Sequence, residues 1–354
     1  MARSSSSPIG LLAVAKEANV SIATVSNTLN RPDVVSAATR ARVLAVIAKM
    51  DFVPNTAAAS LRRGSNRLLG LVVPDISNPF YSEIARGVTA AADRHRYGVI
   101  LCNSQDDPAR ELDQLEMLAE HRAAGALVVP LTADRRRLSR LRSLGTHLVL
   151  IDRESSDGCS TSIDDVLGGR LAAQHLIDTR DANFVLVNGS PSIPQCADRR
   201  EGARAALSAS GYDPDSLVEY EVNDMTTDAG VEIAGQLLKK ELPSGIFCTN
   251  DLLAIGVMRA LASHGVVVPD KVAIVGYGDL APAADAPIPL TTVDQPKFAL
   301  GNAAVEMMLS ELNEKDEAHR HSGTVFRPTL VVRKSAPGFA ERADNGLQAS
   351  EQAG

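Results

Sequence analysis

The sequence predicts an α/β protein in which a three-helix headpiece precedes a core of two doubly wound subdomains. Short amphipathic segments of helical period fill the start of the chain. From Leu68 onward, apolar strand-like segments alternate with helical ones, which is the pattern of a parallel α/β fold. A length of 354 residues provides for two or three domains.

The first helices form a helix-turn-helix in this prediction. The stretch "LLAVAKEANVSIATVSNTL" gives helices at about Leu11–Ala18 and Ile22–Leu29, and "NVS" between them allows only a tight turn. A third helix lies in "SAATRARVLAVIAKMDF", with Ser36 as its N-cap. The apolar side chains that we expect to form a small core are Leu12, Ala15, Val20, Val25, Leu29, Val43, Val46 and Ile47.

The core is predicted from eight apolar strands in two groups. The first group reads "LLGLVVP", "YGVILCNS", "GALVVP" and "HLVLID". The second group reads "FVLVNG", "LVEYEV", "GIFCTN" and "VAIVGY". Most are continuously apolar, as parallel strands are when helices cover both faces of the sheet, so we expect two doubly wound units.

The helix at Ile22–Leu29 carries an unusual face of small polar residues, and the headpiece around it is basic. Residues 1–66 contain eight Lys and Arg against three Asp and Glu, a net charge of +5, whereas the remaining residues carry −12 of the total of −7. A basic head on an acidic body predicts a polyanion partner for the head alone. Charge by itself leaves ordinary solvated charge equally open.

Composition excludes several classes of protein. The apolar runs are too short to span a membrane, and "MARSSSSPIG" lacks the apolar core of a signal peptide. The four cysteines are scattered without a CxxC pair, so we expect them reduced in a cytoplasmic protein.

Motifs of catalysis and cofactor binding are absent from the sequence. HExxH, GxSxG and Walker A patterns do not occur, and because the seven histidines are dispersed we expect neither a metal site nor a catalytic triad.

"GYGDLA" matches a dinucleotide fingerprint in spacing only. The "PAADAPIP" that follows has three prolines, which forbid the regular helix that would hold a phosphate, so we expect no cofactor.

Seven stretches resemble the LacI/GalR family of transcriptional regulators, in the order of that family and over about residues 9–336. They are "VAKEANVSIATVSNTLN", "VSAATRARVLAVIAKMDFVPNTAAASL", "LLGLVVPDISNPFYSEIARGV", "IFCTNDLLAIGVMRAL", "VPDKVAIVGYGDL", "PLTTVDQP" and "RPTLVVRKS". The resemblance implies a helix-turn-helix headpiece, a hinge helix and a two-part core like periplasmic sugar-binding proteins.

The domain boundaries follow from this resemblance. The headpiece spans residues 9–54, the hinge helix and linker 55–66, and the effector-binding and dimerisation core 67–336. The first subdomain takes about 67–163 and 296–323, and the second about 164–295 and 324–336. Residues 337–354 are small and polar, and we expect a disordered tail there.

The resemblance assigns the polar helix to a DNA major groove. Ile22, Ala23 and Asn27 would face base edges, where Asn27 is suited to adenine and the other two to a thymine methyl. Short donors suited to phosphates are Ser21, Thr24, Ser26 and Asn30. In the hinge, Leu61 would be a minor-groove wedge with Ala58 packed close to it.

Candidate effector contacts lie where strands end, at a cleft between the two units. Asp75, Phe80, Tyr81, Asp152 and Arg153 follow strands of the first unit, and Asp164 falls at an expected crossover. By resemblance, Arg199 and Asn250 occupy ligand-binding positions, and Asp251 suits the role of N-cap. Each could instead be a structural cap or a strand-end ion pair.

Two departures from the family pattern concern the ligand. In "GYGDL", Gly278 stands where the family has a ligand-binding acid, so only Asp279 remains. Met225 stands where an aromatic residue commonly walls the pocket. Both changes remove features that grip sugars, so the effector is either an atypical sugar or another small molecule such as a nucleoside.

These features predict a cytoplasmic, homodimeric repressor that binds a pseudo-palindromic operator and responds to a small-molecule effector. Two alternatives remain: a solute-binding protein, which would share the core, and a sugar-processing enzyme with a DNA-binding head. The first leaves residues 9–62 unexplained, and the second lacks a phosphate loop or a poised acid/base pair.

Overall fold

The computed structural model describes residues 10–52, 67–131, 146–180, 182–313 and 319–338. The chain forms two compact units, residues 1–66 and 67–354, which are described separately. The predicted hinge with Ala58 and Leu61 lies outside the described residues, as does the predicted tail from residue 339 onward.

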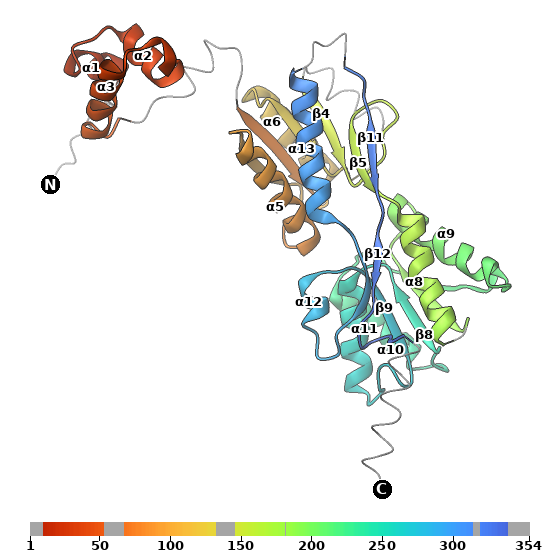
Figure 1. The fold of residues 1–354 in the computed structure, drawn as a ribbon. Coiled ribbons are helices and arrows are strands. Elements are labelled where there is room, and N and C mark those ends of the chain that lie inside the picture. The colour runs from red at the N-terminus through yellow and green to blue at the C-terminus, as the bar shows by residue number, and fades with distance from the viewer. Residues whose placement is uncertain (1–9, 53–66, 132–145, 181, 314–318, 339–354) are drawn as a thin grey trace. The chain divides into compact units, whose positions relative to one another are not determined.

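The headpiece is a helix-turn-helix followed by a third helix, as predicted. Its helices are α1 (Leu11–Glu17), α2 (Ile22–Asn30), the short 3₁₀ helix η1 (Pro32–Val34) and α3 (Ala37–Lys49) (Figure 1). Asn19 turns the chain between α1 and α2 with a φ of 51°, a conformation that asparagine tolerates. Ser21 and Ser36 cap α2 and α3 by accepting hydrogen bonds from the Thr24 and Thr39 amides, at 3.0 and 3.3 Å.

The prediction that Leu12 belongs to the headpiece core is wrong. Leu12 is 68% exposed, and its neighbour Val14 is fully buried instead, because α1 turns the face of Val14 and Ala18 toward α2 and α3. The buried set is Val14, Ala15, Ala18, Val25, Val43 and Phe52.

The core contains two six-stranded sheets. The first has the order β11-β5-β4-β3-β1-β2 and the second β12-β10-β9-β8-β6-β7. Neighbouring strands are parallel except β10 and β12, which are antiparallel. The strands of the first sheet are β1 (Leu68–Val73), β2 (Gly98–Asn103), β3 (Gly125–Val128), β4 (His147–Ile151), β5 (Ser160–Ile163) and β11 (Gly323–Phe326). Those of the second are β6 (Phe184–Asn188), β7 (Val218–Glu221), β8 (Gly245–Cys248), β9 (Ala273–Gly278), β10 (Thr291–Asp294) and β12 (Thr329–Val331).

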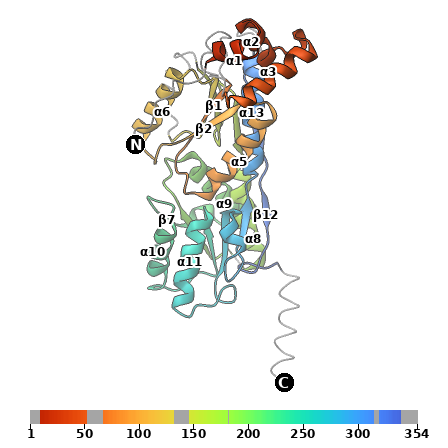
Figure 2. The same cartoon turned by 90° about the vertical axis from the view of Figure 1, so that its left-hand side faces the viewer.

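Helices cover both faces of each sheet, which is why successive residues of the central strands are buried although they point to opposite faces. In β1, Leu69 and Leu71 pack with α5 (Pro79–Arg94) and α13 (Lys297–Asn313), whereas Val72 packs with α6 (Pro108–Glu120). On the second sheet, α10 and α11 lie side by side on one face (Figure 2), and α8 and α9 cover the other. The remaining elements are α8 (Asp165–Thr179), α9 (Pro194–Ala209), η2 (Pro214–Ser216), α10 (Thr227–Leu237), α11 (Asp251–Ser263) and α12 (Ala281–Ala284).

The chain crosses between the sheets three times, and each crossing follows the carboxyl end of a strand. The crossings join β5 to α8, β10 to α13, and β11 to β12. Because β11 pairs with β5 through Phe326 and Ile163, the last crossing follows Phe326 rather than residue 323. After β9 comes only the four-residue helix α12, so the chain offers no dinucleotide-type helix there.

Candidate DNA-binding face and effector cavity

Helix α2, which the resemblance assigns to a DNA major groove, packs one face into the headpiece core and leaves another face outside it. Val25 is fully buried and Thr28 is 5% exposed, whereas Ile22 is 43% exposed. Ser21 and Ala23 are exposed as well, and Thr24, Ser26 and Asn27 are half-buried. Six of the seven predicted DNA-contact residues therefore lie outside the headpiece core, and the side chain of the seventh, Asn30, is not described.

A cavity of about 200 Å³ lies between the two sheets of the core, where strands end. Seven of the ten predicted effector contacts line it: Phe80, Tyr81, Asp152, Arg153, Arg199, Met225 and Asn250. The first subdomain supplies the first four of these and the second supplies the others. Gly278 also lines the cavity, with a φ of 136° that side chains rarely adopt, so an acid there would strain the backbone.

Arg199, which lines the cavity, is held in a buried network. Its Nε donates to Asp165 Oδ1 at 2.8 Å, and its Nη1 donates to the Thr249 carbonyl at 2.7 Å. The guanidinium lies 3.9 Å from the centre of the Tyr277 ring, and the Tyr277 hydroxyl donates to the same Asp165 oxygen at 2.7 Å. Arg199 also lines the cavity, so a ligand there can reach it.

This network depends on the close approach of α8 and α9. A Cβ at Gly169 or Gly202 would collide with the backbone of the facing helix, so glycine at these two positions lets the helices approach. The approach places Asp165 of α8 beside Arg199 of α9. Burial and the negative charge of Asp165 act oppositely on Arg199, and the net effect raises its pKa, so the guanidinium stays charged.

Asp152 is the buried carboxyl of the cavity. It follows β4 with a φ of 59° and is 8% exposed. Burial first, and the negative charge of Asp165 second, raise its pKa to about 7, although Arg199 and a hydrogen bond from Gln195 act in the opposite direction. The Asp152 carboxyl therefore exchanges its proton near neutral pH.

Four buried polar atoms, all in residues that line the cavity, lack a hydrogen-bond partner among the described residues. Two are acceptors, Asp152 Oδ1 and Gln195 Oε1, and two are donors, Arg153 Nε and Gln295 Nε2. Unpaired buried polar atoms are costly in a folded protein, so four of them in residues that line one cavity favour a ligand or water as the missing partner.

Three predicted effector contacts are not among the residues that line the cavity, and each has a partner elsewhere. The carboxylate of Asp75 accepts hydrogen bonds from the Ser77 amide and hydroxyl, at 2.9 and 2.6 Å. Asp164 caps α8 by accepting from the Leu167 amide at 2.9 Å. Asp279 pairs with Arg333 at 2.7 Å.

Asn250, rather than Asp251, is the N-cap of α11. Its Oδ1 accepts from the Leu253 amide at 2.7 Å, and its Nδ2 donates to the Met225 carbonyl at 2.8 Å. Asp251 is instead buried and accepts hydrogen bonds from the Leu280 amide and the Thr292 hydroxyl. Burial raises the pKa of Asp251 to about 6, with these two hydrogen bonds opposing the shift.

Sequence reasoning missed several residues that line the cavity. Asp106 follows β2 and Gln295 follows β10, so strand ends could have pointed to both. Gln195 and Tyr277 carried no comparable signal. Gln195 lies on α9 one turn before Arg199, and Tyr277 lies inside a buried strand.

The headpiece and the core cavity together define a ligand-responsive DNA-binding regulator, and comparison with known proteins agrees. Residues 11–55 match the family described as bacterial regulatory proteins, lacI family, and residues 173–336 match the periplasmic binding protein-like domain. The chain belongs to the lacI family of bacterial regulatory proteins. It is a transcriptional repressor with an effector-binding core rather than an enzyme.

Relatives and solved structures cover nearly the whole chain. The HTH-type transcriptional repressor PurR of Photobacterium profundum is 32% identical over 326 residues, which are 91% of this chain and 97% of the relative. The ribose operon repressor of Escherichia coli (strain K12) is 34% identical over 331 residues, 91% of this chain and 98% of the relative. The lac repressor dimer bound to operator and the anti-inducer ONPF has the same fold, with a TM-score of 0.84 at 24% identity over 94% of this chain and 100% of that one.

A further structural relative contains a sugar. The transcriptional regulator CelR in complex with cellobiose matches with a TM-score of 0.69 and 28% identity, over 92% of this chain and 99% of that one. Among the described residues, no helix is both long and apolar enough to cross a membrane.

Proposed function

We propose that this chain is a homodimeric, cytoplasmic repressor whose effector is a small polyhydroxylated molecule of monosaccharide size. The observation that carries this proposal is the set of unpaired polar atoms in residues that line the cavity, which includes both donors and acceptors. A hydroxyl group both donates and accepts, so a ligand with several hydroxyls can satisfy all of them.

The lining groups and the size of the cavity support the same class of ligand. The cavity lining contains two carboxyls, Asp106 and Asp152, and two guanidiniums, Arg153 and Arg199, so it offers both acceptors and donors to a polar ligand. A volume of about 200 Å³ lies below the range typical of pockets for drug-sized ligands, so it favours one sugar ring. Ribose and cellobiose appear in the names of relatives, of which only ribose has this size.

On the DNA side, the proposal assigns base readout to Ile22, Ala23 and Asn27, and phosphate contacts to Ser21, Thr24, Ser26 and Asn30. Exposure of Ile22 and Ala23 on α2 supports the first group. Ala58 and Leu61 remain proposed as minor-groove contacts of the hinge, on the resemblance alone. Two headpieces in a dimer would then read the two halves of a pseudo-palindromic operator.

A ligand screen tests the effector class. The full-length protein is heated with ribose and other monosaccharides, with cellobiose, and with nucleosides, and the unfolding temperature is measured. We expect at least one monosaccharide to raise the unfolding temperature, because a ligand that binds only the folded state stabilises it. A nucleoside alone, or the disaccharide alone, producing the shift would overturn the assignment to a monosaccharide.

Two variants confirm where the ligand binds. Asp152→Asn should weaken the thermal shift by the active sugar, whereas Asp93→Asn, an exposed carboxyl on α5, should leave it unchanged. An operator selected from random duplexes by the full-length protein then shows whether the same sugar changes DNA affinity. A sugar that stabilises the protein without altering operator affinity would contradict its role as effector.

A further inference from the structure

The edge of the first sheet opposite the effector cavity carries a cluster of four potential metal ligands. Cys159 immediately precedes β5, and His319 and His321 precede β11. The parallel pairing of Ser160 with Gly323 brings the starts of these two strands together. The fourth member, Glu311, lies in the last turn of α13, which packs against β5.

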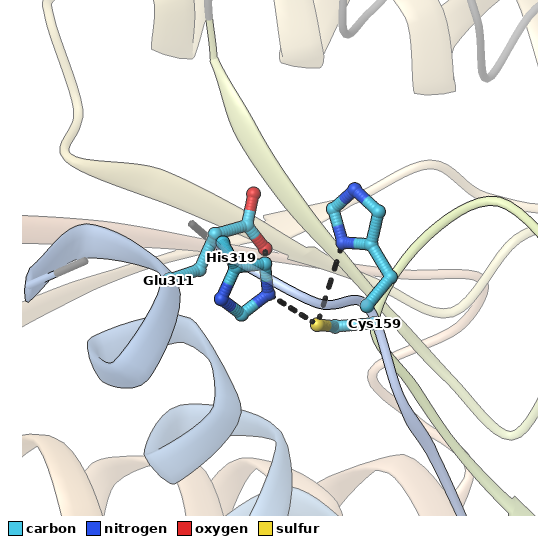
Figure 3. A group of neighbouring side chains, drawn as sticks. Cys159, Glu311 and His319 are labelled. Carbon is cyan, nitrogen blue, oxygen red and sulfur yellow. Dashed lines mark hydrogen bonds and ion pairs between the residues drawn. The ribbon is translucent and has the colours of Figure 1, made fainter. Parts of the chain in front are cut away.

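The ligand atoms converge. All four lie within 4.8 Å of one another. Cys159 Sγ is 3.1 Å from His319 Nε2 and 3.7 Å from His321 Nδ1, and His319 Nε2 is 3.9 Å from Glu311 Oε2. Figure 3 shows the Cys159 sulfur linked to two imidazole nitrogens, with the Glu311 carboxylate next to His319. Ligands of a tetrahedral Zn²⁺ ion are about 3.3–3.7 Å apart at ordinary bond lengths, so closure needs only small side-chain movements.

The cluster also contains a buried acceptor aimed into it. His147 Nδ1 lies 3.0 Å from Glu311 Oε1, whereas the buried Oε2 accepts no hydrogen bond among the described residues. An outer imidazole that holds one carboxylate oxygen and orients the other is a typical supporting contact of a metal ligand. The side chains of His319 and Glu311 are 9% and 11% exposed, so these two members of the cluster are largely shielded from water, whereas His321 is exposed.

A catalytic Cys-His-Glu triad would need a different arrangement. In a triad, one ring nitrogen of the histidine faces the nucleophile and the other faces the acid. Here the same nitrogen, His319 Nε2, faces both the thiol and the carboxylate. Cys159 is also 1% exposed, which denies a substrate access to its sulfur. The thiol and the carboxylate both face the same imidazole nitrogen, an arrangement that fits a bound cation rather than a proton relay.

We propose that Cys159, Glu311, His319 and His321 form a binding site for a transition-metal dication of the Zn²⁺ class. One sulfur, two imidazoles and one carboxylate are the donor set that Zn²⁺ and Co²⁺ accept in tetrahedral geometry, and hard cations such as Mg²⁺ do not use thiolates. On binding, the Cys159 thiol releases its proton to solvent and the thiolate takes the metal. The bound ion would tie the end of α13 to the starts of β5 and β11.

Cobalt titration tests this site directly. The reduced full-length protein is freed of metal with a chelator and titrated with CoCl₂ alone. We expect saturation at one Co²⁺ per protomer, with a thiolate-to-cobalt charge-transfer band and the strong visible bands of tetrahedral cobalt. Zn²⁺ should displace both signals and raise the unfolding temperature of the protein.

Two variants and two matched controls locate the ligands. Cys159→Ser should abolish the charge-transfer band, and His321→Ala, at an exposed position, should weaken Co²⁺ binding about tenfold or more. Cys102→Ser and His121→Ala, which lie outside the cluster, should bind as the parent does. Circular dichroism checks whether each variant folds. If Cys159→Ser does not fold, the Co²⁺ affinity of His321→Ala tests the proposal instead. The proposal fails if Cys159→Ser keeps the band, if His321→Ala binds as tightly as the parent, or if Co²⁺ binds only in octahedral geometry or not at all.

Discussion

Gln195 and Asp152 join the two subdomains across the effector cavity. The Gln195 side-chain amide on α9 donates to the main-chain carbonyl of Asp152 at 2.7 Å and to its carboxylate at 3.1 Å. Asp152 follows β4 of the first sheet, so one side chain of the second subdomain holds a strand end of the first. Because both residues line the cavity, a ligand that pairs with either one acts on the contact between the subdomains.

Removal of this bridge should loosen the core and weaken effector binding. For Gln195→Ala we expect the free energy of unfolding to fall by about 1–3 kcal/mol, because a buried carboxyl loses a hydrogen bond. The control Gln236→Ala, at an exposed site on α10, should change stability by less than about 0.5 kcal/mol. Urea unfolding of both variants measures the difference, and equal stabilities would show that the bridge contributes nothing.

Stability should fall as pH rises through neutrality. The Asp152 carboxyl has its pKa raised from 3.8 to about 7 in the folded protein, so the folded state holds a proton that the unfolded chain releases above pH 3.8. The stabilisation is complete below that value and is lost as pH rises through about 7. Asp251, with its pKa raised to about 6, acts in the same direction.

The Asp152→Asn variant isolates one of these two carboxyls. Its stability should fall less steeply than that of the parent between about pH 6 and 8, whereas Asp93→Asn should follow the parent. Urea unfolding at several pH values across this range measures the slopes. Parallel curves for the parent and Asp152→Asn would show that Asp152 does not titrate in this range.

We expect replacement of Arg199 to lower the stability of the fold, apart from any effect on ligand binding. Arg199→Ala would leave the Asp165 carboxylate buried without its charge partner, which costs about 3–5 kcal/mol. We expect a large drop in the unfolding temperature, so loss of ligand response in this variant would not by itself locate the ligand.

A double-mutant cycle separates the two roles of Arg199. Combining Arg199→Met with Asp165→Asn removes both charges together and should recover part of the stability lost in Arg199→Met alone. If the double variant folds but no longer responds to the effector, Arg199 contacts the ligand. If the stability lost in the double variant equals the sum of the losses in the two single variants, the ion pair contributes nothing to stability.

Asn27 should discriminate among DNA sequences, whereas Thr24 should not. Asn27→Ala is expected to weaken binding to the selected operator by about 1–3 kcal/mol and binding to random DNA much less, because a base-edge contact is lost. Thr24→Val, which removes a hydroxyl proposed to contact phosphate, should weaken both to a similar degree. Gel-shift titrations at two salt concentrations measure all four affinities, and equal losses for Asn27→Ala on both DNAs would show that it contacts only the backbone.

The sequence alone determined the headpiece, the eight apolar strands and seven of the residues that line the cavity. Local signals sufficed for these: Ser21 and Ser36 as caps, continuous apolar runs for strands buried on both faces, and strand ends for Asp152 and Arg153. Four strands were missed, among them β5 ("STSI") and β10 ("TTVD"), because short polar segments become strands only when neighbours pair with them.

Only the tertiary structure decided which polar residues share a site. Asp164 and Asp279 have the residue types of ligand contacts, yet Asp164 caps a helix and Asp279 pairs with Arg333. Cys159 and His319 are far apart in the sequence, and the histidines are dispersed along it. The parallel pairing of β5 with β11 brings them within 3.1 Å, a relation that no local pattern contains, because strand pairing is set by the packing of the whole sheet.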